Sequence, residues 1–523
     1  MGLARTRTVV LVGVEGHVVE VEADITPGLP ATVIVGLPDA AVGESRDRVR
    51  AAVLNSALPW PKTRITVGLS PASLPKRGSS LDLAIAAGVL AAEGVVPLES
   101  LEGVALVGEL ALDGRVRPVP GVLVAAIAAR RAGASTLVVP DAHADEAALV
   151  PGLHVVAVTC LRELVAVLRD EDREPFVLAA APGCRPASPE TDQPVVVPDL
   201  RDVRGQATAR HALEVAAAGG HHLALLGSPG VGKTMLAERL PGLLPDLQEQ
   251  EALEVTAVHS VAGRLGSHGR LVVRPPYAAP HHTTTLVAMV GGGSGSVARV
   301  GLVSVAHRGV LMLDEAPEFD AGVLDALRQP MESGEVTVSR AGFAVTLPAR
   351  FQLVLAANPC PCGRGMDPLG RGHEPCTCTP HQKRRYLGRI SGPLLDRVDL
   401  RLVLERPTAA DLAFGEAHAE ASCVVADRVA QARLRAAARL AGTPWRTNGE
   451  VPGPELRRRF PPGPGTEPVL DRLVAGPSES ARGVDRVVRL AWTIADLAGH
   501  DRPGPDDLLQ ALGLRSSEGR WAA

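Results

Sequence analysis

The chain has 523 residues, with 46% hydrophobic, 21% charged and only 2% aromatic residues, and its formal net charge is −4. At about 100–200 residues per domain, this length predicts about three domains. The high apolar content excludes disorder over most of the chain, and the slightly acidic balance excludes a protein that coats nucleic acid with a uniformly basic surface. Any contact with nucleic acid must therefore be local.

The beginning of the chain and its cysteines narrow the class of protein further. The apolar run 9–14 ends at Glu15 and His17, which is too short for a secretory signal or a membrane span. We therefore expect a cytoplasmic protein without membrane contact. Seven cysteines are too sparse for a disulfide scaffold, and four of them lie between Cys360 and Cys378, which indicates a metal site or a local structural role.

Changes in composition divide the chain into four segments. Residues 1–170 mix short valine-rich runs with alanine-rich helical stretches, an α+β pattern, and residues 171–198 have the proline-rich, aperiodic composition of a linker. In residues 199–405 the expected strands and helices alternate, which predicts an α/β domain with a mostly parallel sheet. Residues 406–523 predict a small helical domain. The predicted fold class is therefore α/β, with an α+β domain before the sheet domain and a helical domain after it.

A phosphate-binding loop is the most specific motif in the sequence. It follows an expected buried strand (222–226), precedes an expected helix, and consists of Gly227, Ser228, Pro229, Gly230, Val231, Gly232, Lys233 and Thr234. The glycines let backbone N–H groups approach the phosphates, and the helix N-terminus adds its positive dipole end. Lys233 supplies an ammonium group to the phosphates of ATP, and Thr234 offers its hydroxyl to Mg²⁺.

Polar residues follow two further expected strands. The apolar strand 310–313 ends in Asp314, which we assign to Mg²⁺, and Glu315, which we assign to the general base that activates the attacking water. Strand 352–356 leads to Asn358, which is placed to orient that water. The alternatives are two solvated acids and an ordinary turn asparagine.

Several more motifs accompany these residues and extend the pattern. They are Pro280-His281-His282, Val290-Gly291-Gly292-Gly293, Asn358-Pro359-Cys360-Pro361-Cys362-Gly363 and Leu394-Leu395-Asp396-Arg397-Val398-Asp399. With the phosphate loop, the series resembles the AAA+ ATPases of the magnesium-chelatase-like branch known as ComM or YifB. The resemblance covers essentially the whole chain and is most specific in residues 199–405. It implies an AAA+ core that uses ATP and Mg²⁺, followed by a helical lid.

The same resemblance implies a homo-hexamer with ATP bound between subunits. Arg397 matches the arginine finger that acts on the neighbouring subunit's ATP, and Arg482 matches the second sensor, which reaches the γ-phosphate from the lid. The residues alone leave other interpretations open. Arg397 could form a surface salt bridge with its flanking acids, and Arg482 could be a solvated helix residue.

One segment of the ATPase block is a candidate contact for DNA. Residues 335–346 alternate apolar and polar side chains around an Arg-Ala-Gly turn, which predicts a β-hairpin with Arg340 and Phe343 at its tip. Such a tip suits a phosphate backbone and a base face, although a hairpin without a partner fits the pattern equally well.

The resemblance favours DNA as the partner. ComM-like proteins look like ATP-dependent motors that drive branch migration on single-stranded or branched DNA during natural transformation. The alternative is a MoxR- or chelatase-like ATPase that remodels a protein or a metallocofactor partner. The chain has no recognisable acidic metal-ion-dependent adhesion-type domain of the kind that accompanies chelatase subunits, and on that ground we prefer the DNA motor.

The cysteines and histidines of the ATPase block are candidate metal ligands. Cys360, Cys362, Cys376 and Cys378 offer four thiolates for a structural Zn²⁺, with His373 and His381 as substitutes. The C-x-C spacing is less typical of zinc than C-x₂-C, so reduced cysteines in a Gly/Pro-rich loop are the alternative. His281 and His282 are adjacent and point in different directions, and we interpret them as loop structure.

The first domain resembles the proteolytic domain of Lon in residues 75–87, 108–110 and 114–121. Ser80 falls near the Lon nucleophile. A serine nucleophile needs a base, and Leu123 stands where Lon has its lysine. No lysine lies between Lys76 and Lys233 in the sequence, which leaves Lys76 as the alternative base. We therefore expect no peptidase activity and a domain reused for assembly or substrate guidance.

Overall fold

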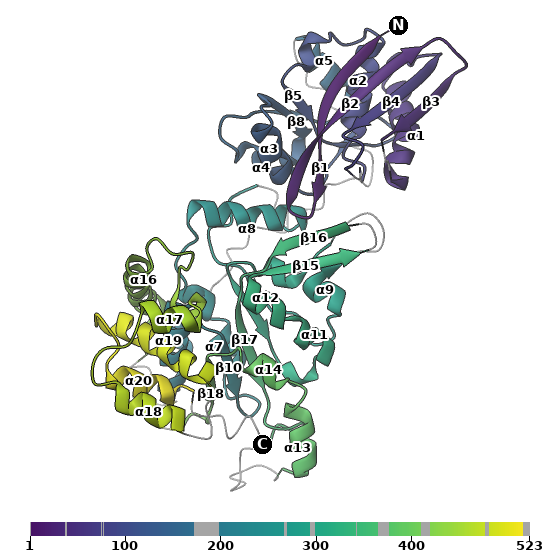
Figure 1. Ribbon diagram of the computed structural model, residues 1–523. Helices are drawn as coiled ribbons and strands as arrows, with labels where there is room; N and C mark the ends of the chain where they lie inside the picture. Colours follow the sequence, from purple (N-terminus) through teal and green to yellow (C-terminus); the bar gives the residue numbers. More distant parts are fainter. Residues whose placement is uncertain are drawn as a thin grey trace.

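The computed structural model describes residues 2–36, 39–74, 76, 78–171, 198–265, 269–292, 299–340, 343–364, 376–408, 419–475 and 481–515. Within these ranges Figure 1 shows an N-terminal α+β body, a central α/β body and a helical body beside the central one. Residues 172–197, almost all of the predicted linker, lie outside the described residues.

The N-terminal body contains a mixed sheet with the strand order β3-β4-β2-β1-β5-β8-β9. A long antiparallel hairpin forms its centre, and β5, β8 and β9 extend the sheet in parallel from β1. Alternate residues of β1 face opposite sides, so Val10 packs in a core with α1, α2 and α5, whereas Val9 packs in a second core with α3 and α4. The bounds are β1 (Leu3–Val12), β2 (Glu15–Thr26), β3 (Ala31–Val35), α1 (Ala40–Asn55), β4 (Arg64–Ser70), α2 (Asp82–Ala92), β5 (Val104–Leu106), β6 (Glu109–Leu110), β7 (Val116–Arg117), α3 (Val122–Arg131), β8 (Thr136–Pro140), α4 (Ala144–Ala148), β9 (His154–Val158) and α5 (Leu161–Leu168).

The central body contains a parallel sheet with the order β11-β14-β17-β10-β18. Both faces of the sheet are covered, so its strands are mostly apolar, as parallel strands usually are; Gln352 of β17 and Arg401 of β18 are buried polar exceptions. The bounds of these strands and of the helices between them are α6 (Ala207–Gly219), β10 (Leu223–Leu226), α7 (Lys233–Ala237), α8 (Glu249–Val261), β11 (Tyr277–Ala278), α9 (Leu286–Val290), α10 (Leu302–Val305), β14 (Val310–Leu313), α11 (Ala321–Ala326), α12 (Arg328–Ser333), β17 (Gln352–Ala357), α13 (Pro380–Leu387), α14 (Gly392–Leu395) and β18 (Leu400–Val403).

Two short antiparallel pairs flank the central sheet. The strands β12 (Gly291–Gly292) and β13 (Arg299–Val300) form one pair, and β15 (Glu335–Arg340) and β16 (Phe343–Pro348) form the other. The register of the second pair places Arg340 opposite Phe343, which confirms the hairpin predicted for 335–346.

The helical body packs directly on one face of the central sheet. Trp492 and Val425 share a core with Leu225 of β10 and Val354 of β17. Its helices are α16 (Ser422–Arg439), α17 (Gly453–Arg459), α18 (Glu467–Ala475), α19 (Ala481–Ala498) and α20 (Pro505–Gly513). Within the described parts of the chain, no helix is both long enough and apolar enough to span a bilayer.

Helix α8 lies between the N-terminal and central bodies in Figure 1. Its Leu253 and Ala257 pack against the core that contains α3, and the hydroxyl of its Ser260 donates a short hydrogen bond to the buried carboxylate of Glu146 from α4. On its other side, Glu251 forms ion pairs with Arg308 of the central body, at 3.0 Å, and with Arg446 of the helical body. One helix thus contacts all three bodies.

Candidate active site

The phosphate loop lies at the carboxyl edge of the central sheet, between β10 and α7. Two of its three glycines, Gly230 and Gly232, have φ of +75° and +99°, and a Cβ atom built at either position would meet no atom within 4 Å. The backbone can adopt this left-handed conformation because glycine has no side chain, and the space in front of the loop stays open. This is the cradle that a phosphate group needs.

Lys233 is the first residue of α7, and only 7% of its surface is exposed. Its Nζ donates to the carbonyl oxygens of Gly227 at 2.7 Å and Ser228 at 3.1 Å, and to Oδ1 of Asn358 at 3.0 Å. Burial lowers the pKa of the ammonium group, and the nearby carboxylates of Asp314 and Glu315 act in the opposite direction. Asn358 thus lies directly beside the phosphate loop.

The two acids follow β14. Thr234 Oγ1 donates to Asp314 Oδ2 at 2.7 Å, so the two groups assigned to Mg²⁺ are already adjacent. Glu315 has φ of +50°, a left-handed conformation that is rare for a residue with a side chain, and its side chain is 53% exposed. Strained backbone of this kind clusters at functional sites, where it sets the direction of a side chain.

Parallel strands bring these groups together. β17 pairs with both β14 and β10, so the residues after the three strands meet at one edge of the sheet. The residues present fit ATP and Mg²⁺, because a glycine cradle, a buried ammonium and a hydroxyl–carboxylate pair converge there. Mg²⁺, when bound by Thr234 and Asp314, supplies charge neutralisation on the phosphates.

The contacts of Lys233 predict the effect of its removal. In Lys233→Ala the phosphates lose charge-assisted hydrogen bonds worth about 1.5–3 kcal/mol each, so ATP affinity should fall by about 100-fold or more. Titration with a fluorescent ATP analogue measures this loss. The matched control is Lys62→Ala, which removes an exposed lysine of the N-terminal body. Equal ATP affinity of the two variants would contradict the assignment.

Arg397 and Arg482 line one groove with a volume of about 1170 Å³, and no residue of the phosphate loop lines it. Arg397 donates to the carbonyl oxygen of Pro393 at 2.6 Å and forms a short ion pair with Glu332. Arg482 is exposed at the start of α19. The two arginines are thus on a shared surface of the molecule, separate from the phosphate loop of their own chain.

Asp399, the acid two residues after Arg397, is not a surface residue. It is 4% exposed, lies 3.3 Å from Nδ1 of His221 and 3.7 Å from Arg486 of α19. Burial alone would raise its pKa, but the hydrogen bond with His221 and the positive charge of Arg486 lower the pKa of Asp399 well below its usual range. A buried polar contact therefore joins the segment of Arg397 to the helical body.

His282 is a site residue that the sequence interpretation missed. Its Nδ1 lies 3.8 Å from the Glu315 carboxylate, because the segment after β11 runs beside β14. The rings of His281 and His282 lie with their centroids 4.0 Å apart at an angle of 35°, so the expectation that the two side chains point in different directions is wrong. The signal in the sequence was the polar pair His281-His282 shortly after the strand β11. Its significance depends on β11 being the neighbour of β14, which is followed by Asp314 and Glu315, and the sequence did not give this strand order.

The four candidate zinc ligands are brought together. Cys360, Cys362, Cys376 and Cys378, which we call the cysteine cluster, have their sulfur atoms within 4.8 Å of one another. His381 is exposed on α13, and His373 lies outside the described residues.

Arg340 and Phe343, the candidate DNA contacts, occupy the last position of β15 and the first position of β16, which pair with each other.

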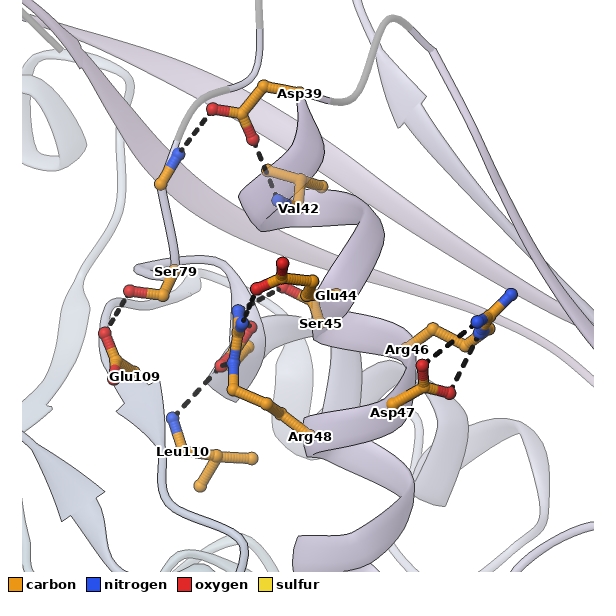
Figure 2. Close-up of polar contacts among 12 residues, drawn as sticks. Asp39, Val42, Glu44, Ser45, Arg46, Asp47, Arg48, Ser79, Glu109 and Leu110 are labelled. Atoms are coloured by element: carbon orange, nitrogen blue, oxygen red, sulfur yellow. Dashed lines mark hydrogen bonds and ion pairs between the residues drawn. The ribbon is translucent and has the colours of Figure 1, made fainter. Parts of the chain in front are cut away.

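Figure 2 shows polar contacts of the N-terminal body. The Asp39 carboxylate accepts from the amides of Val42 at 2.8 Å and Gly78 at 3.4 Å, and it caps α1. Arg48 donates to the fully buried Asp82 at 2.9 and 3.1 Å. These groups satisfy one another within the domain.

The residues compared with the Lon active site make contacts within the N-terminal body. Ser79, next to Ser80, donates a short hydrogen bond to Glu109. Lys76 is fully buried and its Nζ donates to the carbonyl oxygen of Pro71, while Leu123 packs in the apolar core. The ammonium of Lys76 is thus held by the backbone.

Comparison with known proteins gives matches along the chain. The models described as magnesium chelatase, subunit ChlI, match residues 199–412 and 21–143, and the C-terminal model of this subunit matches residues 419–515. The uncharacterized protein Rv2897c of Mycobacterium tuberculosis is 52% identical over 99% of this chain and 100% of its own length. The uncharacterized protein YifB of Escherichia coli is 39% identical over 99% of this chain and 97% of its own. Competence protein ComM of Haemophilus influenzae is 38% identical over 99% and 98%.

A shorter match concerns the first domain alone. Lon protease 2 of Thermus thermophilus is 27% identical over 145 residues, which are 26% of this chain and 18% of that protein. The Lon-like α+β domain, the P-loop sheet and the helical C-terminal body together confirm the predicted fold class. The chain therefore belongs to the ComM/YifB family of magnesium-chelatase-like AAA+ ATPases with an N-terminal Lon-like domain.

Proposed function

We propose that this protein is an ATP-dependent motor of the ComM type that moves along single-stranded or branched DNA. The observation that carries the proposal is the nucleotide site formed by the phosphate loop, Asp314, Glu315 and Asn358 in a chain similar to competence protein ComM over its whole length. A site of this kind can couple ATP hydrolysis to movement. Its use on DNA is the part of the proposal that experiment must decide.

The proposed active form is a homo-hexamer with ATP between subunits. Arg397 and Arg482 share a groove that the phosphate loop of the same chain does not line. A second copy that seated its phosphate loop against this groove would give ATP two cationic partners. Arg397 would exchange its ion pair with Glu332 for the developing charge on the γ-phosphate.

Contact with DNA is proposed for the hairpin of β15 and β16. With 2% aromatic residues in the chain, extended base stacking is a weak option, and arginine contacts to phosphates should dominate. Binding should therefore depend strongly on salt and little on sequence.

The test compares ATP turnover with and without DNA. Forked and single-stranded DNA should raise the turnover of the full chain, and Arg340→Ala should weaken DNA binding about equally for all sequences and lower the slope of log affinity against log salt by about 1. Arg472→Ala, which removes an exposed arginine of the helical body, should behave like the unchanged protein. Turnover that is indifferent to every DNA tested would contradict the proposal.

That negative outcome would favour the other candidate. The ChlI models match the chain, so a chelatase- or MoxR-like ATPase that acts on a protein or metallocofactor partner is the alternative. A pull-down that returns one stoichiometric protein partner and no nucleic acid would support it.

A further inference from the structure

The cysteine cluster has the spacing of a four-sulfur metal site. The Sγ atom of Cys360 lies 3.3 Å from that of Cys362 and 3.7 Å from that of Cys376, and the Sγ atoms of Cys362 and Cys376 are 3.6 Å apart. Four thiolates bound to Zn²⁺ at about 2.3 Å in a tetrahedron lie about 3.8 Å from one another. The cluster therefore needs little rearrangement to hold the ion.

Neither a disulfide nor a group of neutral thiols fits the cluster as well. A disulfide brings its sulfurs to about 2.0 Å, far closer than the distances here, and these four cysteines are free. Neutral thiols are weak donors and acceptors, so they gain little from gathering in one place. A bound cation gives all four sulfurs a common partner.

Backbone groups around the cluster support thiolates. The amide of Arg364 donates to the sulfur of Cys362. Helix α13 begins at Pro380, two residues after Cys378, with Thr379 and Gln382 forming a capping box. Amide donors and a helix N-terminus both stabilise the net negative charge of a four-thiolate metal site.

The cluster also touches the nucleotide site. Cys360 is two residues after Asn358, which accepts the hydrogen bond from Lys233. The turn from Cys360 to Gly363 lies against the phosphate loop, because a Cβ atom on Gly363 would come within 2.5 Å of Pro229. On the other side, Tyr386 of α13 lies within interaction distance of the Asn358 side chain. The cysteine cluster therefore connects two segments beside Asn358. One is the loop from Asn358 to Gly363, and the other is the segment that leads into α13 and Tyr386.

We propose that the four thiolates of the cysteine cluster bind one Zn²⁺ ion and that this ion holds Asn358 in place beside Lys233. The site is structural, since all four positions of the tetrahedron are filled by protein sulfur. Zn²⁺ suits it because this ion has no redox chemistry and is almost always held by four ligands in a tetrahedron in structural sites. The first half of the proposal is independent of the motor function, and the second half depends only on ATP hydrolysis.

The first experiment measures metal in the full chain purified without chelators. Mass spectrometry should find about one Zn²⁺ per chain. Titration of the thiols with a mercurial should release this Zn²⁺. Co²⁺ in its place should give the absorption bands of tetrahedral thiolate coordination. Cys362→Ser and Cys378→Ser should lose the metal, whereas Cys423→Ser, at an exposed cysteine of α16 outside the cluster, should keep it. A metal-free protein with four reactive thiols, or iron in place of zinc, would overturn the proposal.

The second experiment tests the positioning of Asn358. Cys362→Ser should lower kcat for ATP by about the same factor as Asn358→Ala, with ATP affinity changed less than about twofold. The double variant should be no slower than Asn358→Ala alone, because the two changes act through one group. Cys378→His, which retains a zinc ligand, should restore much of the rate lost in Cys378→Ser. Losses that multiply in the double variant would show that the cluster does not act through Asn358, even with zinc present.

Discussion

Arg397→Ala should lower kcat for ATP by about 10³-fold or more while leaving ATP affinity nearly unchanged. An arginine finger is worth about 10³–10⁵ in kcat, because its charge acts on the transition state of phosphoryl transfer more than on bound ATP. Arg397 lines a groove away from the phosphate loop of its own chain, so it is absent from the binding contacts of that chain. Steady-state turnover and binding of a non-hydrolysable analogue measure the two quantities separately.

A mixing experiment distinguishes action between subunits from action within one. Lys233→Ala subunits retain Arg397 and lack a working phosphate loop, whereas Arg397→Ala subunits have the reverse defect. Mixed rings should therefore recover part of the turnover that neither variant shows alone. Arg384→Ala, at an exposed arginine of α13, is the control and should turn over ATP normally. A mixture with no more activity than its parts would contradict the shared site.

Glu315→Gln should keep ATP bound and nearly stop its hydrolysis. Glutamine preserves the shape of the side chain but removes the carboxylate that accepts a proton from the attacking water. General-base catalysis contributes about 10²–10⁴-fold, and the single-turnover rate should fall by that factor. Nucleotide extracted from the variant after incubation with ATP should remain mainly ATP.

The control for this change is Glu318→Gln, three residues along the chain. Glu318 is 39% exposed and pairs with Arg389, so its carboxylate already has a partner outside the phosphate loop. Its variant should hydrolyse ATP within about twofold of the unchanged protein. If the two variants behave alike, Glu315 is not the base.

Local sequence signals predicted most of the elements that carry the candidate site. The strand before the phosphate loop, the strand before Asp314 and Glu315, and the strand before Asn358 lie where the apolar runs placed them, within one residue at each end. The hairpin of β15 and β16 also agrees with its prediction. These features depend on neighbouring residues, so a single sequence contains the information needed to find them.

Contacts between distant segments could not be predicted in this way. The pairs of His282 with Glu315 and of Glu332 with Arg397 depend on strand order and helix packing, which the hydrophobic pattern does not specify. The burial of Asp399 is another example, because both of its partners are distant in the sequence. His221 is 178 residues before it, and Arg486 lies on α19 of the helical body. The cysteine pairs could be noted from the sequence, but only the structure places their sulfurs together.

Helix α8 joins the Lon-like domain to the ATPase core and to the helical body, which corresponds to the lid. Its Ser260 contacts Glu146 of that domain, while its Glu251 is shared by Arg308 of the core and Arg446 of the lid. A lid that rotates during the ATP cycle must either carry α8 with it or break the Arg446 ion pair. In the first case the helix works as a lever, and each stroke reaches the N-terminal domain as a displacement. The domain would then follow the ATP cycle of its own subunit.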